Sequence, residues 1–134
     1  MIGLDTNILV RYITQDDAVQ ANLATQYIEK NCSAESPGFI NHIVLCELVW
    51  VLTRCYKADN NQALEVIEQL LRTVQLQIQE PQIAWAALRS AQKGKADFAD
   101  FMIIQINRVS GCEETVTFDN GAAGINGATL LTDI

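Results

Sequence analysis

The chain alternates between short apolar runs and longer segments with helical periodicity. Apolar runs at residues 2–4, 37–40 and 114–118 are of strand length, and the ATLLT segment (128–132) forms a weaker strand pattern. The VQLQIQ segment (74–79) alternates with period two, which is typical of a half-buried strand at a sheet edge.

Between these runs, apolar residues recur every three or four positions, which predicts five helices. They are expected over residues 16–31, 42–56, 60–74, 81–94 and 98–109. Asn41 and Asn60 suit helix caps, and Pro81 suits a first helical turn. Strands that alternate with helices predict an α/β sandwich with a mostly parallel sheet.

Composition narrows the class of protein. A length of 134 residues predicts one domain, 1–134, and 49% hydrophobic with 19% charged residues is typical of a globular chain. No apolar run approaches the roughly 20 residues of a membrane helix. The apolar N-terminus is too short for a signal peptide and lacks its basic flank, so we expect a cytoplasmic protein. The four cysteines show no C-x-x-C pairing, which favours buried free thiols.

A net charge of −7 argues against a large nucleic-acid footprint, because such footprints depend on Lys and Arg. It does not exclude a site that contacts phosphate through a divalent cation. The positions of the acidic residues therefore decide the interpretation.

Two aspartates follow predicted strands. Asp5 ends the first strand and Asp119 ends the TVTF strand, so one parallel sheet would carry both at the edge where α/β proteins bind ligands. Asp97 and Asp100 lie three residues apart at a helix start, which makes them neighbours on its first turn. Glu47 is isolated in the apolar segment IVLCELVWVL, so it faces either a cleft or a partner charge.

Each acid also has an ordinary structural explanation. Asp5 suits a turn or a helix cap, and Asp119 begins the turn sequence DNG. Asp97 suits the N-cap of the helix it precedes, with Asp100 favourable to the helix dipole. Glu47 could pair with an arginine at position 11 or 54.

Convergence of several carboxylates is harder to explain structurally, because like charges raise one another's pKa unless a cation neutralises them. An all-oxygen site suits Mg²⁺ or Mn²⁺. A metal held in this way can activate water and stabilise charge during phosphodiester cleavage. The acids therefore indicate a metal-dependent hydrolase.

The order LDTN, an isolated Glu in a helix, ADFADFMI and TVTFD resembles a PIN domain, most closely the VapC-type ribonuclease toxins of bacterial toxin–antitoxin pairs. The resemblance spans nearly the whole chain. It implies a three-layer α/β/α sandwich, an endoribonuclease that uses Mg²⁺ or Mn²⁺ to cleave RNA, a homodimer, and an antitoxin partner that places a basic segment in an acidic groove.

The resemblance also implies roles for individual residues. Four acids match the catalytic, metal-binding set of the family: Asp5, Glu47, Asp100 and Asp119. Asp97 accompanies the third acid in relatives and is a lower-ranked ligand.

Three neighbouring polar residues match supporting positions. Thr6 and Asn7 match residues that hold the turn after the first acid, and Thr117 matches a hydroxyl residue that supports the fourth. Many relatives place a further acid or base after the fourth aspartate, whereas this chain has Asn120 and Gly121. That departure would weaken a second metal site.

Two other functions are alternatives to the nuclease. Phosphoryl transfer to an aspartate would require D-x-D after the first strand, where this chain has Asn7. A catalytically silent module could instead bind a basic peptide in the acidic groove. Among the cations, Lys93 and Lys95 are the best candidates for contact with RNA phosphates, ahead of Arg11 and Arg108.

Overall fold

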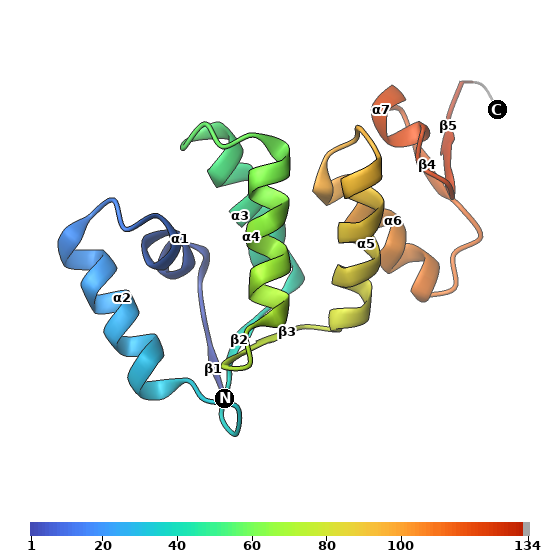
Figure 1. Cartoon of the computed structure of the whole chain (residues 1–134). Coiled ribbons are helices and arrows are strands. Elements are labelled where there is room, and N and C mark those ends of the chain that lie inside the picture. Colours follow the sequence, from blue (N-terminus) through green and yellow to red (C-terminus); the bar gives the residue numbers. More distant parts are fainter. Residues whose placement is uncertain (133–134) are drawn as a thin grey trace. The chain divides into compact units, whose positions relative to one another are not determined.

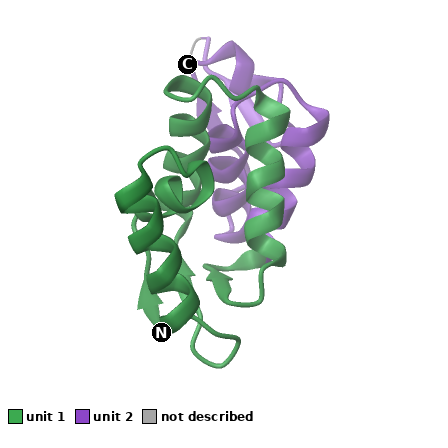
Figure 2. Ribbon diagram, turned by 60° about the vertical axis from the view of Figure 1, so that its left-hand side comes forward, with its two compact units in different colours: residues 1–81 green, residues 82–134 purple. Residues whose placement is uncertain are grey.

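The computed structural model describes residues 1–132, in which seven helices and five short strands alternate (Figure 1). The chain divides into two compact units, residues 1–81 and 82–134, which Figure 2 distinguishes by colour. Each unit is described by itself. No helix among the described residues is long and apolar enough to cross a membrane.

Unit 1 contains a parallel three-stranded sheet with the order β1-β2-β3. Its elements, in chain order, are β1 (Ile2–Gly3), α1 (Thr6–Thr14), α2 (Ala18–Asn31), β2 (Gly38–Ile40), α3 (His42–Arg54), α4 (Asn60–Arg72) and β3 (Leu76–Ile78). The alternating VQLQIQ segment thus supplies a strand at an edge of this sheet, as predicted.

Unit 2 contains three helices and a parallel strand pair among its described residues. Its elements are α5 (Pro81–Lys93), α6 (Phe98–Val109), β4 (Thr115–Thr117), α7 (Asn120–Ala123) and β5 (Ala128–Leu130). Pro81 begins α5 and Gly111, with φ of 97°, follows the end of α6, as their conformational preferences predict.

All five helices predicted from periodicity are present, but α1 and α7 were not predicted. Both are capped by a strand-ending aspartate: Asp5 precedes α1 and Asp119 precedes α7. The cap of α4 is Asp59, not the predicted Asn60. Asp59 accepts the amide of Gln62 at 2.8 Å, and the Gln62 side chain accepts the amide of Asp59 at 2.9 Å.

The strands form two sheets within the described residues, because β4 pairs only with β5. Asp5 and Asp119 therefore follow strands of different sheets, and not of one sheet as the strand pattern predicted. The strands are two or three residues long, so few side chains specify which strand pairs with which.

The core of each unit is formed by apolar side chains of its helices, joined in unit 1 by Ile40 of β2. The periodic apolar residues of α2 are not all part of it, because Val19 is 72% and Leu23 63% exposed. The largest fully buried side chains of unit 1 are Leu9, Ile40, Leu45, Leu48, Leu64 and Ile67. Those of unit 2 include Leu88, Phe98 and Met102. The cysteines are free, but Cys55 and Cys112 are exposed, so the prediction of buried thiols is wrong for these two.

His42 joins the start of α3 to the end of β3. Its amide donates to Gln79 Oε1 at 3.0 Å, and its Nε2 lies 2.6 Å from the Gln79 carbonyl oxygen. The ring is buried. This contact fixes the helix that carries Glu47 against the sheet.

Gly38→Ala should destabilise the fold by about 1–3 kcal/mol, the usual cost of overpacking a filled core. An added Cβ would lie 2.8 Å from Leu4 Cδ1 and 2.9 Å from Cys32 Sγ, and both side chains are buried. Urea unfolding of the variant measures the loss.

Gly3→Ala is the matched control, because Gly3 lies on the neighbouring strand and an added Cβ would meet nothing within 4 Å. It should change the free energy of unfolding by less than about 0.5 kcal/mol. Equal losses in both variants would contradict the packing argument.

Candidate functional site

Asp5 lies where β1 turns into α1, and it serves as the N-cap of that helix. Its Oδ1 accepts the Thr6 amide at 2.8 Å. The side chain is exposed, so the carboxylate bears no large burial cost. Among residues 1–132, its second oxygen has no hydrogen-bond partner and can bind a ligand.

Glu47 is joined to the same turn through Thr6. The Thr6 hydroxyl donates to Glu47 Oε1 at 2.6 Å, across 41 positions of sequence. Glu47 is exposed on α3 between two apolar side chains that are also exposed, Ile43 at 72% and Trp50 at 58%. The buried Thr6 thus holds one of the predicted acids by its amide and another by its hydroxyl.

The alternative role of Glu47, an ion pair with an arginine, is wrong. Arg11 pairs instead with Asp16, at 3.1 Å. Arg54 forms no ion pair with Glu47 in the part of the chain that the structure describes.

Asp5 and Glu47 line one pocket of unit 1, with a volume of about 630 Å³. Its other walls include Asn7, Arg11, Trp50 and Tyr56. A cavity of this size is within the range of small-ligand sites. Trp50 and Tyr56 were not identified as site residues from the sequence, because their helical positions alone do not show that they face this pocket.

A hydrogen-bond network borders this pocket. The Tyr56 hydroxyl donates to Asp16 at 2.6 Å, and the Thr14 hydroxyl donates to the same carboxylate at 2.8 Å. These two hydrogen bonds, with the charge of Arg11, lower the pKa of Asp16 to about 2. Asp16 is therefore a satisfied structural carboxylate, unlike the acids of unit 2.

In unit 2, Asp119 caps α7 as Asp5 caps α1. Its Oδ1 accepts the Gly121 amide at 2.8 Å and the Ala122 amide at 3.5 Å. The Asp119 amide in turn donates to the Thr117 hydroxyl at 3.0 Å. The second carboxylate oxygen has no hydrogen-bond partner among residues 1–132, so Asp119 is oriented and still open to a ligand.

Asp97 and Asp100 begin α6. Asp97 occupies the N-cap position, but its carboxylate makes no capping hydrogen bond. The pKa of Asp100 is raised above its ordinary value, first by burial and then by the charges of Asp119 and Asp97. The carboxylate of Asp100 therefore lies close enough to those of Asp119 and Asp97 to feel their charge.

The structure thus groups the predicted acids as a pair in unit 1 and three in unit 2. Among residues 1–132 no ion pair compensates the three acids of unit 2. Carboxylate oxygens of this kind suit a hard divalent cation. Within residues 1–132, no three His, Cys, Asp or Glu side chains already stand in a metal-binding cluster.

The order and local structure of these acids can be compared with known families. The family model of the PIN domain matches residues 2–127. The chain belongs to the PIN domain family. A search of curated proteins found no match.

Membership of the PIN family confirms the α/β fold class predicted from the strand and helix pattern. PIN domains are generally nucleases that use divalent metal ions, so the family supports a nuclease role for this chain. The carboxylates described above are the side chains with the chemistry for such a role.

Asp100→Asn should stabilise the metal-free protein at pH 7. Because the folded-state pKa of Asp100 is above its ordinary 3.8, its ionisation costs the folded state more than the unfolded chain. Stability is therefore lost as pH rises through the raised pKa. We expect a gain of a few tenths of a kcal/mol, after allowance for solvent screening.

Urea unfolding in EDTA at pH 7 and near pH 3.5 measures this gain. It should be largest at pH 7 and fade at the lower pH, where wild-type Asp100 is protonated. Glu113→Gln removes an exposed charge elsewhere in unit 2 and is the control. An equal gain in both variants would point to net charge instead of local repulsion.

Proposed function

We propose that this PIN domain is a Mg²⁺- or Mn²⁺-dependent endoribonuclease and the toxin of a bacterial toxin–antitoxin pair. One observation carries the proposal: acids that match the PIN pattern are held in place by backbone amides or by Thr6, with an oxygen left open for a ligand. Helix capping could explain Asp5 and Asp119, but it does not explain Glu47, which lies within α3 on an apolar face.

In this proposal Asp5, Glu47, Asp100 and Asp119 bind the metal, and Asp97 assists. A bound divalent ion would supply an activated water and would neutralise charge that develops on the scissile phosphate. The carboxylates contribute negative charge at fixed positions. Burial and then the charges of Asp119 and Asp97 raise the pKa of Asp100, and a bound cation would offset both effects by stabilising the ionised carboxylate.

Three polar residues support these acids. Thr6 orients both Asp5 and Glu47, while Thr117 accepts the amide of Asp119. Asn7 lines the pocket that Asp5 and Glu47 share, where its amide can contact substrate or the hydration shell of the metal. Their role is to position the acids without carrying charge themselves.

The proposed partners are those that the resemblance to VapC-type toxins implies. A chain with net charge −7 and open carboxylates suits an antitoxin that inserts a basic segment. We also propose that the chain acts as a single domain, 1–134, that it forms a homodimer, and that it works in the cytoplasm. Co-purification with the neighbouring gene product and light scattering test the partners and the oligomeric state.

Metal removal and substitution of single acids test the nuclease directly. Antitoxin-free protein should cleave single-stranded or structured RNA with Mg²⁺ or Mn²⁺ and not with EDTA. Asp5→Asn and Asp100→Asn should each reduce cleavage by at least about 10³-fold. The Asp5 variant should remain folded, because asparagine also caps helices well.

A metal titration followed by thermal unfolding provides a second readout. Wild-type protein should gain thermal stability with Mn²⁺ through preferential binding to the folded state, and each variant should gain less. Wild-type cleavage by Asp5→Asn would refute its assignment. Normal binding of a basic peptide without cleavage of any RNA would favour the silent binding module.

Thr6→Val tests the link between the two acids of unit 1. Valine keeps the shape of the buried side chain but removes the hydroxyl that donates a hydrogen bond to Glu47. We expect kcat and metal affinity to fall about tenfold, as for other residues that orient metal ligands, with little change in KM.

Thr53→Val is the matched control for this substitution. The Thr53 hydroxyl donates to the Val49 carbonyl within α3 and contacts none of the predicted acids. It should retain wild-type kinetics and metal affinity. A tenfold loss in both variants would assign the effect to general destabilisation.

A further inference from the structure

Unit 2 contains a second pocket, with a volume of about 570 Å³, whose charged lining residues are all cationic. They are Lys93, Lys95 and Arg108, and no carboxylate of residues 1–132 lines the pocket. In a protein of net charge −7 this is a local reversal of sign. A pocket of this charge and size suits one anionic group attached to a compact organic body.

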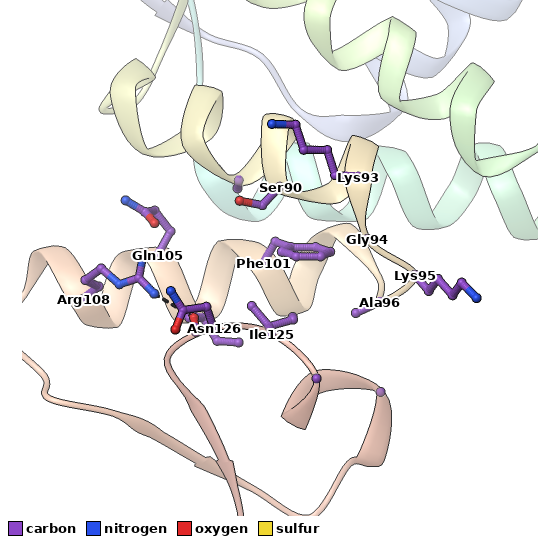
Figure 3. A pocket seen from close by; sticks show the side chains of 14 residues that line it. Ser90, Lys93, Gly94, Lys95, Ala96, Phe101, Gln105, Arg108, Ile125 and Asn126 are labelled. Carbon is purple, nitrogen blue, oxygen red and sulfur yellow. Dashed lines mark hydrogen bonds between the residues drawn. The ribbon is translucent and has the colours of Figure 1, made fainter.

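The cations lie at different parts of the pocket, as Figure 3 shows. Lys93 ends α5 and Lys95 extends outward from the following turn, so both lie at the rim. Arg108 lies beside Asn126, on the far side of Phe101 in this view. Flexible lysines at a rim suit phosphate oxygens, which they bind as point charges.

Arg108 is held in place by the backbone. Its Nη2 donates to the Asn126 carbonyl at 2.7 Å. An added Cβ at Gly127 would lie 2.6 Å from this nitrogen, so the guanidinium can approach the chain only because residue 127 is glycine. The remaining N–H groups of Arg108 keep a defined direction for polar atoms of a ligand.

Between the cations, the pocket has an apolar surface. Phe101, Ile104 and Ile125 contribute to its lining, together with the polar side chains of Gln105 and Asn126. Such a surface can cover one face of a sugar or base, while amide groups meet its edges. A ligand with both an anionic group and a ring that packs on an apolar surface fits this pocket better than inorganic phosphate does, and a nucleotide has both features.

The pocket is continuous in sequence with the acids of unit 2. Ala96, which lines it, directly precedes Asp97, and Gly121, also in its lining, donates its amide to Asp119. A strand of RNA whose scissile phosphate meets the acids would therefore bring a neighbouring nucleotide to the cations.

We propose that this pocket of unit 2 binds one nucleotide of a single-stranded RNA, with its uncleaved phosphate at Lys93 and Lys95. The inference rests on the proposed function for the identity of the substrate. In this proposal, the cations of the pocket supply affinity for the RNA, and they are separate from the metal-binding acids. This would explain how a protein of negative net charge binds RNA.

Binding of RNA in EDTA tests the pocket without cleavage. The probe is a fluorescein-labelled single-stranded RNA of about ten nucleotides, followed by anisotropy at several salt concentrations. The pocket variant is Lys93→Gln with Lys95→Gln. The control is Lys30→Gln with Lys57→Gln, which removes the same charge from exposed lysines of unit 1.

We expect about tenfold weaker binding for the pocket variant and a salt slope reduced by about 0.7, the value for one lost phosphate contact on a single strand. The control should lose much less. In cleavage with Mn²⁺, the pocket variant should raise KM and leave kcat unchanged.

Equal losses in both double variants, or no loss in either, would overturn the proposal. Tighter binding of polyglutamate than of RNA would also overturn it and would assign the pocket to an acidic peptide. Lysine-dependent RNA binding without any cleavage would leave this inference standing while the proposed nuclease fails. If the pocket variant cleaved RNA with an unchanged KM, this inference would fail while the proposed nuclease would stand.

Discussion

The turn from a parallel strand into the next helix depends on one interaction: a polar side chain that accepts the first free amides of the helix. Asp5 does this after β1, Asn41 after β2 and Asp119 after β4. Helix starts leave amides without internal partners, and a capping side chain satisfies one or more of them at each of these three turns. Where it is an aspartate, one carboxylate oxygen caps and the other is available to a ligand.

The same residue type serves opposite purposes in the two units. Asp16 has a pKa near 2 because Tyr56 and Thr14 donate to it, whereas the pKa of Asp100 is raised by burial and by neighbouring acids. A carboxylate with donors is already stabilised and needs no further partner. A carboxylate among other carboxylates gains from a cation, which separates candidate ligands from structural acids.

In the proposed mechanism, groups of opposite charge bind the metal ion and the RNA. The acids favour a divalent ion and repel RNA in its absence, while the pocket of Lys93, Lys95 and Arg108 attracts phosphate. The net charge argues against a large nucleic-acid footprint but not against a local phosphate site, because electrostatic attraction at short range depends on the groups nearest the ligand.

The sequence by itself determined the helices, the strand segments and the identity of the acids, because apolar periodicity and motif order are local properties. It did not reveal α1 and α7, whose start depends on caps at Asp5 and Asp119. Only the tertiary structure decided that Thr6 holds Glu47, that the strands pair as two sheets, and that three cations line one pocket. Such contacts join residues distant in sequence, and short strands carry too few side chains to specify their partners.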